Sequence, residues 1–191
     1  MLRDLETVNN LETIMMTDAE RAFALKQLDQ SRGRLAQLLQ GLSPEQLLYR
    51  PEPGRWSIAE NVEHTVVVES RLVGAMEKLL AGPPDVSKQS SKTDAEVVWL
   101  VGNVVSPLQA PERVLPSLRW PPQSIAREFE IARQHTRDFA SATAGDLRAH
   151  FINHFVFGDL DCYQWLLLIG AHCNRHCAQS EVVKLSRGFP A

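Results

Sequence analysis

The feature that most constrains the fold is a series of long segments with helical spacing of apolar residues, most of which begin with a capping box. In a capping box, the N-cap side chain and the side chain three residues later each accept a hydrogen bond from the other residue's backbone N–H. The pairs that open the first, second and fourth long segments are Thr17 with Glu20, Ser57 with Glu60, and Asp161 with Gln164. The long segments cover residues 17–41, 57–82, 122–143 and 161–188. Four amphipathic helices predict an all-α fold.

The connections narrow the architecture further. Residues 83–121 combine a polar loop, a shorter helical segment (94–105) capped by Thr93 and Glu96, and a proline-rich stretch. No run of any length alternates with period two, and Asn-Gly and Asp-Gly turns are absent, so we expect no strands. The prediction is a four-helix bundle with a long crossover between helices two and three, in one domain spanning residues 1–191.

Composition excludes several classes of protein. Twenty Lys and Arg residues stand against 23 Asp and Glu residues, so no basic surface for nucleic acid is expected. No apolar run reaches the length of a membrane span. The first 16 residues lack the apolar core of a signal peptide, and three cysteines, an odd number, suit a reducing compartment. We therefore expect a cytoplasmic protein.

The stretch "GAHCNRHCAQ" (170–179) carries the most chemistry. His172 and His176 are one helical turn apart, so two imidazole nitrogens can converge on one ion. Cys173 and Cys177 are rotated by about 100° from them on an ideal helix, so one ion cannot take all four side chains without distortion. We interpret the cysteines as core residues, with a thiol near the site as the alternative.

Other histidines compete for the same role. His64 is the only histidine of the second long helix and is the candidate third ligand. His150 and His154 also have the i, i+4 spacing, but they lie in a short segment between two glycines that would hold ligands less rigidly. His135 lies between two arginines and is expected to face solvent.

Supporting roles can be assigned on the same basis. Glu60 lies one turn before His64 and either orients that ring through its spare N–H or serves only in the capping box. Gln179, three residues after His176, either hydrogen-bonds near the site or only completes the packing. The remaining candidates are expected in other roles, with Glu63 and Glu69 solvated and Trp56 and Trp165 packed in the core.

Two segments together resemble a known family. "GRWSIAENVEHTVVVE" is similar to the Trp-Ser-x-x-Glu-x-x-x-His segment of the DinB/YfiT-like superfamily, and "NHFVFGDLDCYQWLLLIGAHCNRHCAQ" is similar to its later His-x-x-x-His segment. The resemblance covers nearly the whole chain in the order and spacing of helices. It implies a four-helix bundle with a divalent metal, usually zinc, nickel or iron, held by His64, His172 and His176. Phe155 stands where the family often has a proline, and the cysteines are not part of its metal pattern.

The resemblance implies an enzyme class more loosely than a site. Family members include thiol-dependent S-transferases and isomerases that use low-molecular-weight thiols, and others are described only as hydrolases. We expect a metal-dependent transferase or hydrolase acting on a small molecule, because three neutral imidazoles leave the ion its full charge to acidify a water or a thiol. The alternative is a non-catalytic bundle in which the metal staples helices two and four together. Apolar helix faces would allow a homodimer.

Overall fold

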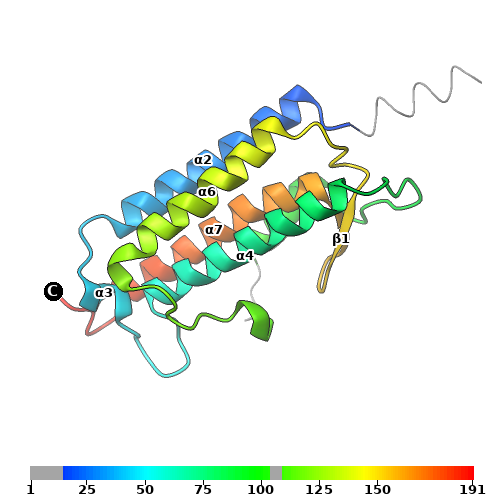
Figure 1. Ribbon diagram of the computed structural model, residues 1–191. Coiled ribbons are helices and arrows are strands. Elements are labelled where there is room, and N and C mark those ends of the chain that lie inside the picture. Colours follow the sequence, from blue (N-terminus) through cyan, green and yellow to red (C-terminus); the bar gives the residue numbers. More distant parts are fainter. Residues whose placement is uncertain (1–14, 104–108) are drawn as a thin grey trace, which may run out of the picture.

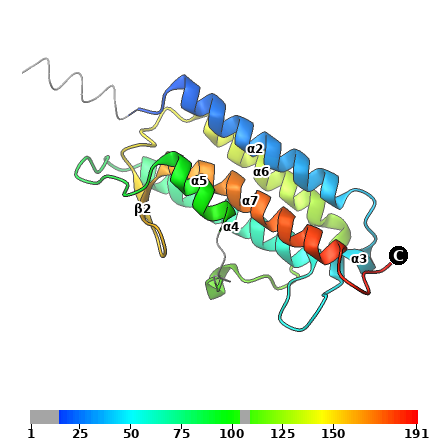
Figure 2. The same ribbon diagram turned by 180° about the vertical axis from the view of Figure 1, so that it is seen from behind.

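The computed structural model describes residues 15–103 and 109–191, and its main feature is a bundle of four long helices (Figure 1). The four are α2 (Asp18–Leu39), α4 (Ile58–Leu80), α6 (Ile125–Ala142) and α7 (Cys162–Lys184). Both α2 and α4 pack against α6 and α7, so α2 and α4 lie at opposite corners of the bundle (Figures 1 and 2). The predicted four-helix bundle is confirmed. The N-terminal segment 1–14 and the last two residues of the predicted 94–105 helix lie outside the described residues.

The predicted capping boxes form at the starts of the helices. In α4, Ser57 Oγ accepts the Glu60 amide at 3.2 Å, and Glu60 Oε2 accepts the Ser57 amide at 2.9 Å. Equivalent reciprocal pairs begin α2, α7, the short helix α3 (Pro44–Leu48) and α5 (Asp94–Gly102). These bonds satisfy amide groups that a helix leaves unpaired at its first turn, which is why the helix starts are readable from local sequence.

The crossover between α4 and α6 runs over the side of the bundle. Helix α5 packs on α7, and the proline-rich part that follows contains two single turns, η1 (Glu112–Val114) and η2 (Pro122–Ser124). We call residues 111–121 the strap. Its turn η1 contacts α4, which places the strap beside the second long helix of the bundle (Figure 2).

A two-stranded hairpin precedes α7, where the sequence predicted no strand. Strand β1 (Phe151–His154) pairs antiparallel with β2 (Gly158–Asp161), with His154 opposite Gly158. Gly158 has φ +78°, a conformation that a glycine adopts without steric cost at the end of a three-residue hairpin loop. Each strand has four residues, too few for an alternating pattern to be recognised.

The core extends along the bundle in two clusters, and α7 contributes to both. Its first half buries residues such as Trp165 and Leu166 among α2 and α5, and its second half buries Cys173 and Cys177 among α4 and α6. Among the described residues, no helix is both long enough and apolar enough to cross a membrane. Helix α7 is therefore the central element of the bundle, and α4 packs beside it.

Candidate metal centre

Three histidines from α4 and α7 meet at one point. His64 lies in the first two turns of α4, and His172 and His176 lie one turn apart on α7. The Nε2 atom of His172 is 3.2 Å from Nε2 of His64 and 3.1 Å from Nε2 of His176. The structure thus brings together the three histidines that the sequence selected, with their donor atoms within 4.8 Å of one another.

Hydrogen bonds at the far side of two rings determine which nitrogen carries the proton. His64 Nδ1 is 2.8 Å from the carbonyl oxygen of Val114, which can only accept, so Nδ1 is the donor. His176 Nδ1 lies 2.9 Å from Oδ1 of Asn61, and the amide of Asn61 is oriented by Nδ2 donating to the Ser57 carbonyl at 2.9 Å. Both rings therefore present an unprotonated Nε2 to the cluster.

The three rings are neutral at neutral pH. Burial lowers the pKa of His172 to about 3, and burial and neighbouring histidine charges lower the pKa of His176 well below its ordinary value. Burial also lowers the pKa of His64, against the opposing effect of its bond to Val114. Neutral imidazole is the form that ligates a metal, so protons do not compete for these nitrogens at pH 7.

The cluster geometry fits a divalent cation. The Nε2 atoms of His64 and His176 are both acceptors, and the one Nε2 proton that a neutral His172 can carry pairs only one of them, whereas a shared cation would engage all three nitrogens. Metal–nitrogen bonds of 2.0–2.1 Å at tetrahedral angles correspond to nitrogens roughly 3.3 Å apart. The described residues contribute no carboxylate to this group, so an ion held there would keep its full charge.

The cluster is enclosed on one side and accessible on the other. His64 and His176 are buried, whereas His172 is partly exposed. The ring of Trp56 lies 4.9 Å from that of His64 and stacks near His176 at 6.0 Å between centroids. Trp56 therefore covers the two buried ligands and is not the core anchor that the sequence suggested. Trp165 is one, since it is 6% exposed and donates to the Ile152 carbonyl.

Glu60 does not orient His64, in contrast to one of the two roles considered for it. Its carboxylate accepts the Ser57 amide and the Nε of Arg50 at 2.7 Å, and the capping geometry turns it toward the start of the helix. The Val114 carbonyl occupies the position at His64 Nδ1 instead. Gln179 is exposed, and its side chain acts to raise the pKa of His176 against the larger effect of burial.

Glu63 and Glu69 were expected in solvent, and that expectation is wrong. Both are 1% exposed, and each is paired with an arginine from a distant part of the chain. Glu63 Oε1 lies 2.7 Å from Nε of Arg119, and Glu69 Oε1 lies 2.8 Å from Nε of Arg133. Each partner is more than 50 residues away, so the local sequence contains no sign of the pairing.

The competing histidines have other partners. His150 bonds to the carbonyls of Asp146 and Gly82, and His154 Nδ1 accepts two amides of the hairpin loop. His135 is exposed and pairs with Glu77 on the surface, as expected. None of the three joins the group formed by His64, His172 and His176.

The cysteines of the same stretch lie in the core. Cys173 and Cys177 are both fully buried, and the Cys173 thiol is 3.7 Å from the Ser31 carbonyl on α2. Burial raises the pKa of Cys162 to about 12, so that thiol is protonated as well as inaccessible. The structure places the cysteines on the side of α7 that packs against the bundle.

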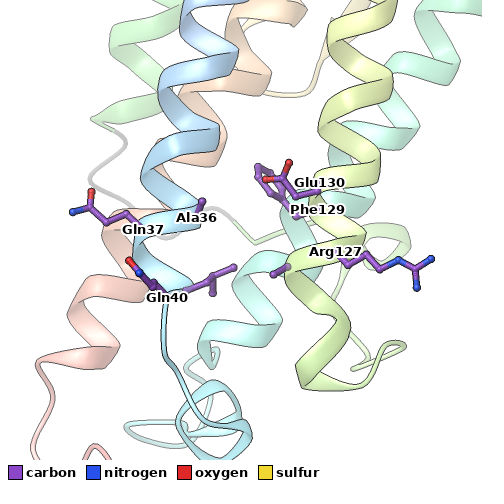
Figure 3. A pocket seen from close by; sticks show the side chains of 8 residues that line it. Ala36, Gln37, Gln40, Arg127, Phe129 and Glu130 are labelled. Atoms are coloured by element: carbon purple, nitrogen blue, oxygen red, sulfur yellow. The ribbon is translucent and has the colours of Figure 1, made fainter.

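A surface groove of about 600 Å³ lies on other helices (Figure 3). It is formed by the end of α2 and the start of α6, which carry no residue of the histidine cluster. The lining residues are Ala36, Gln37, Leu39, Gln40, Ala126, Arg127, Phe129 and Glu130. The histidine cluster and this groove are therefore separate features.

The fold and the site together place this chain in a class of proteins, the four-helix bundles in which histidines of the second and fourth long helices form a candidate metal centre. The model of the DinB superfamily matches residues 27–180, which include all three histidines. The chain therefore belongs to the DinB superfamily, as the sequence resemblance predicted.

Two similar proteins extend this assignment. An uncharacterized protein, YuaE of Bacillus subtilis strain 168, is 28% identical over 148 residues, which is 76% of this chain and 88% of YuaE. The structure of YfiT from Bacillus subtilis, described as a probable metal-dependent hydrolase with an unusual four-helix bundle topology, matches with a TM-score of 0.60. That match covers 92% of this chain and 91% of YfiT at 12% identity, so it shows a shared fold.

Proposed function

We propose that this chain is a metal-dependent enzyme that acts on a small molecule, as a hydrolase or as a thiol-dependent S-transferase. His64, His172 and His176 would hold the divalent ion. The observation that carries the proposal is the convergence of three neutral imidazoles whose Nε2 atoms lie within 4.8 Å of one another. Three neutral imidazoles are the donor set of three-histidine catalytic sites, and one shared cation would engage all three Nε2 atoms.

Each residue of the site has a definable task. A divalent ion bound by three neutral ligands lowers the pKa of a coordinated water or thiol and so supplies a nucleophile at neutral pH. The Val114 carbonyl and the Asn61 side chain hold the proton of their histidine at Nδ1 and keep Nε2 directed at the site. Trp56 excludes solvent from the buried side, and the accessible side at His172 is where substrate would enter.

Water and a thiol are both suitable nucleophiles for this donor set. The description of YfiT as a probable metal-dependent hydrolase supports water, and the thiol-dependent members of the superfamily support a thiol. Zinc, nickel and iron all accept imidazole ligands, so the proposal covers these three metals.

The experiment uses cobalt(II) as a spectroscopic probe. We expect the cobalt-loaded chain to change its visible spectrum on addition of azide or cysteine, because an accessible coordination position accepts a fourth ligand. His172→Ala should lose the metal and the spectrum, whereas His135→Ala, which alters a surface histidine, should behave as the unaltered chain.

Activity assays separate the two reactions. Hydrolysis of a chromogenic ester without thiol would identify water as the nucleophile, and conjugation of cysteine to chlorodinitrobenzene would identify a thiol. A spectrum that is insensitive to azide and cysteine, in a chain that binds cobalt tightly and shows neither activity, would instead support a metal that only staples α4 to α7.

A further inference from the structure

The strap, residues 111–121, has a sequence that cannot pair its own backbone N–H and C=O groups in a regular helix. Residues 111–121 read "PERVLPSLRWP", and the three prolines exclude a continuous helix and remove N–H donors. Apart from the turn η1, the strap has no regular secondary structure, and Ser117, Leu118 and Arg119 are exposed. Its conformation must therefore be imposed by contacts with another part of the molecule.

Glu63 of α4 provides these contacts. Its Oε1 accepts the Ser117 amide at 2.7 Å, and its Oε2 accepts the Arg119 amide at 3.2 Å. The Ser117 hydroxyl and the Arg119 guanidinium add bonds to Oε1 at 3.3 and 2.7 Å. Burial alone would raise the pKa of Glu63, but these amides and the guanidinium lower it below its ordinary value, so the group is a carboxylate. One buried side chain thus holds the strap by four bonds.

The backbone between the two amides is strained. Leu118 has φ +55°, in the left-handed region that a residue with a Cβ rarely adopts. This conformation directs the amides on either side of Leu118 toward one acceptor, in the manner of the backbone nests that bind anions. The carboxylate of Glu63 takes the place of the anion, and without it nothing in the strap itself would favour a left-handed leucine.

The same strap reaches the metal site three residues earlier. Val114 is buried, and its carbonyl accepts the Nδ1 proton of His64 at 2.8 Å. Glu63 and His64 are consecutive residues of α4, so the helix contacts the strap at two points. Glu63 bonds to Ser117 and Arg119, and His64 bonds to Val114.

We propose that Glu63 is a positioning residue for the metal site, which fixes the orientation and tautomer of His64 by holding the Val114 carbonyl in place through the strap. This inference rests on the proposed function only for its effect on metal affinity. The orientation of His64 can be tested without metal.

The first measurement follows the Nδ1–H resonance of His64 in the metal-free chain by ¹⁵N-labelled NMR. We expect a slowly exchanging signal for His64 in the unaltered chain, and its loss in Glu63→Leu, while the His176 signal, which depends on Asn61, persists. Leucine fills the site without an acceptor, and the amides it releases belong to exposed residues of the strap and can bond to water, so this variant should fold. A His64 signal of unaltered intensity in Glu63→Leu would refute the proposal.

The second measurement is zinc affinity. Loss of an outer partner of a ligand histidine typically weakens metal binding about 10–100-fold, and we expect this range for Glu63→Leu. Glu63→Gln, which keeps one acceptor oxygen, should lie between Glu63→Leu and the unaltered chain. Equal zinc affinity in all three would overturn the assignment of Glu63, whereas failure of the unaltered chain to bind zinc would count against the proposed function instead.

Two controls separate positioning from general stability. Glu60→Gln keeps the capping bond of another buried glutamate of α4 and removes its charge opposite Arg50. Arg119→Met removes the ion pair but leaves both strap amides bonded to Glu63. Both variants should retain the His64 signal and bind zinc within about twofold of the unaltered chain. A tenfold loss of zinc affinity in Glu60→Gln would show that any buried charge on α4 matters equally, and would refute the specific role of Glu63.

A third measurement needs no variant. Because coupling between two sites is reciprocal, zinc must stabilise the strap by the same factor by which the strap tightens zinc binding. Hydrogen exchange at the amides of Ser117 and Arg119 should therefore slow by about 10–100-fold when zinc is added. Exchange rates at these amides that do not respond to bound zinc would contradict the proposal.

Discussion

Two largely buried polar clusters share helix α4, and they differ in how completely their groups are paired. The first joins Arg133 of α6 to Glu69 of α4, with Nε and Nη2 of the arginine 2.8 and 2.9 Å from the two carboxylate oxygens. Nη1 also donates to the Leu28 carbonyl and the Ser31 hydroxyl, and Thr136 donates to Glu69 at 2.7 Å. The second is the histidine cluster, where three Nε2 atoms face one another.

The difference shows which cluster serves the fold and which serves a ligand. In the arginine cluster, each charge faces an opposite charge and each donor faces an acceptor of the same chain. This cluster therefore needs no bound ligand. In the histidine cluster, the Nε2 atoms of His64 and His176 are both acceptors and His172 can donate to only one of them, so a cation from outside would be the partner that matches all three. Buried polar groups are normally paired, so an incomplete cluster indicates a bound group more strongly than the identity of its residues does.

The largest effect is expected from breaking the complete cluster. Arg133→Met should lower the free energy of unfolding by about 3–5 kcal/mol, because it leaves the buried Glu69 carboxylate without its counter-charge. Denaturant unfolding of the metal-free chain measures this loss. Arg32→Met removes a surface pair with Glu130, each about one-third exposed, and should cost at most about 1 kcal/mol. Similar losses in the two variants would mean that the buried cluster has no special role.

The histidine cluster should gain stability when its proposed partner, a metal ion, is added. Zinc at 1,000 times its Kd should raise the free energy of unfolding by about 4 kcal/mol if it binds the folded chain alone, and binding to cysteines and histidines of the unfolded chain would reduce this gain. His172→Ala should abolish this gain while leaving the metal-free stability within about 1 kcal/mol, because it removes a partly exposed ring that is not packed in the core. Calorimetry with and without zinc tests both statements. A metal-free His172→Ala chain that is destabilised as strongly as Arg133→Met would show that the histidines form a structural cluster.

The parts of the fold that depend on residues close together in the sequence were predictable. Helix starts follow from capping residues three positions apart, such as Ser57 with Glu60, and helix faces follow from apolar spacing. The hairpin was missed because each strand has four residues and its turn depends on one glycine, Gly158. Pairing of such short strands is decided by their tertiary surroundings rather than by a period.

The site was predictable only in its histidines. Six histidines in 191 residues, with one on α4 and an i, i+4 pair on α7, left few combinations. Val114 acts through its backbone carbonyl, which any residue would supply, so its side chain carries no signal. The buried pairings of Glu63 and Glu69 depend on arginines from α6 and the strap, and only the folded chain brings these together.

A smaller effect is expected from loosening one ligand of the histidine cluster. Asn61→Ala removes the acceptor at Nδ1 of His176 and should weaken zinc binding about 10–100-fold. Competition with a chromogenic chelator measures the affinity. Thr65→Val is the matched control, because the Thr65 hydroxyl donates to the Asn61 carbonyl on the same helix. This control should change zinc affinity less than twofold, and an equal loss in both variants would indicate a general disturbance of α4.

The smallest effect concerns His154, a half-buried histidine whose Nδ1 is paired within the chain only while the ring is neutral. Its Nδ1 accepts the Val156 and Phe157 amides at 3.1 and 3.2 Å, which an imidazolium cannot do. Burial lowers the pKa of His154 from 6.5 to about 4, beside the rings of Phe157 and Trp165. Between these two pKa values the unfolded chain binds more protons than the folded chain, so stability falls as the pH falls from 6.5 to 4.

His154→Asn tests this contribution, because the asparagine oxygen can accept the same loop amides and does not titrate. Between pH 7.5 and pH 5.5, the unaltered chain should lose about 1.4 kcal/mol more free energy of unfolding than the variant. Denaturant unfolding at the two pH values measures the difference, and identical losses would show that His154 does not titrate in this way. Zinc bound at His64, His172 and His176 does not replace any bond of His154, so the difference between the two chains should be the same with and without zinc. If the difference in stability loss between the two chains disappeared with zinc, the hairpin would be coupled to the histidine cluster. His154, which is paired within the chain, could then no longer be treated separately from the three histidines proposed to bind an ion.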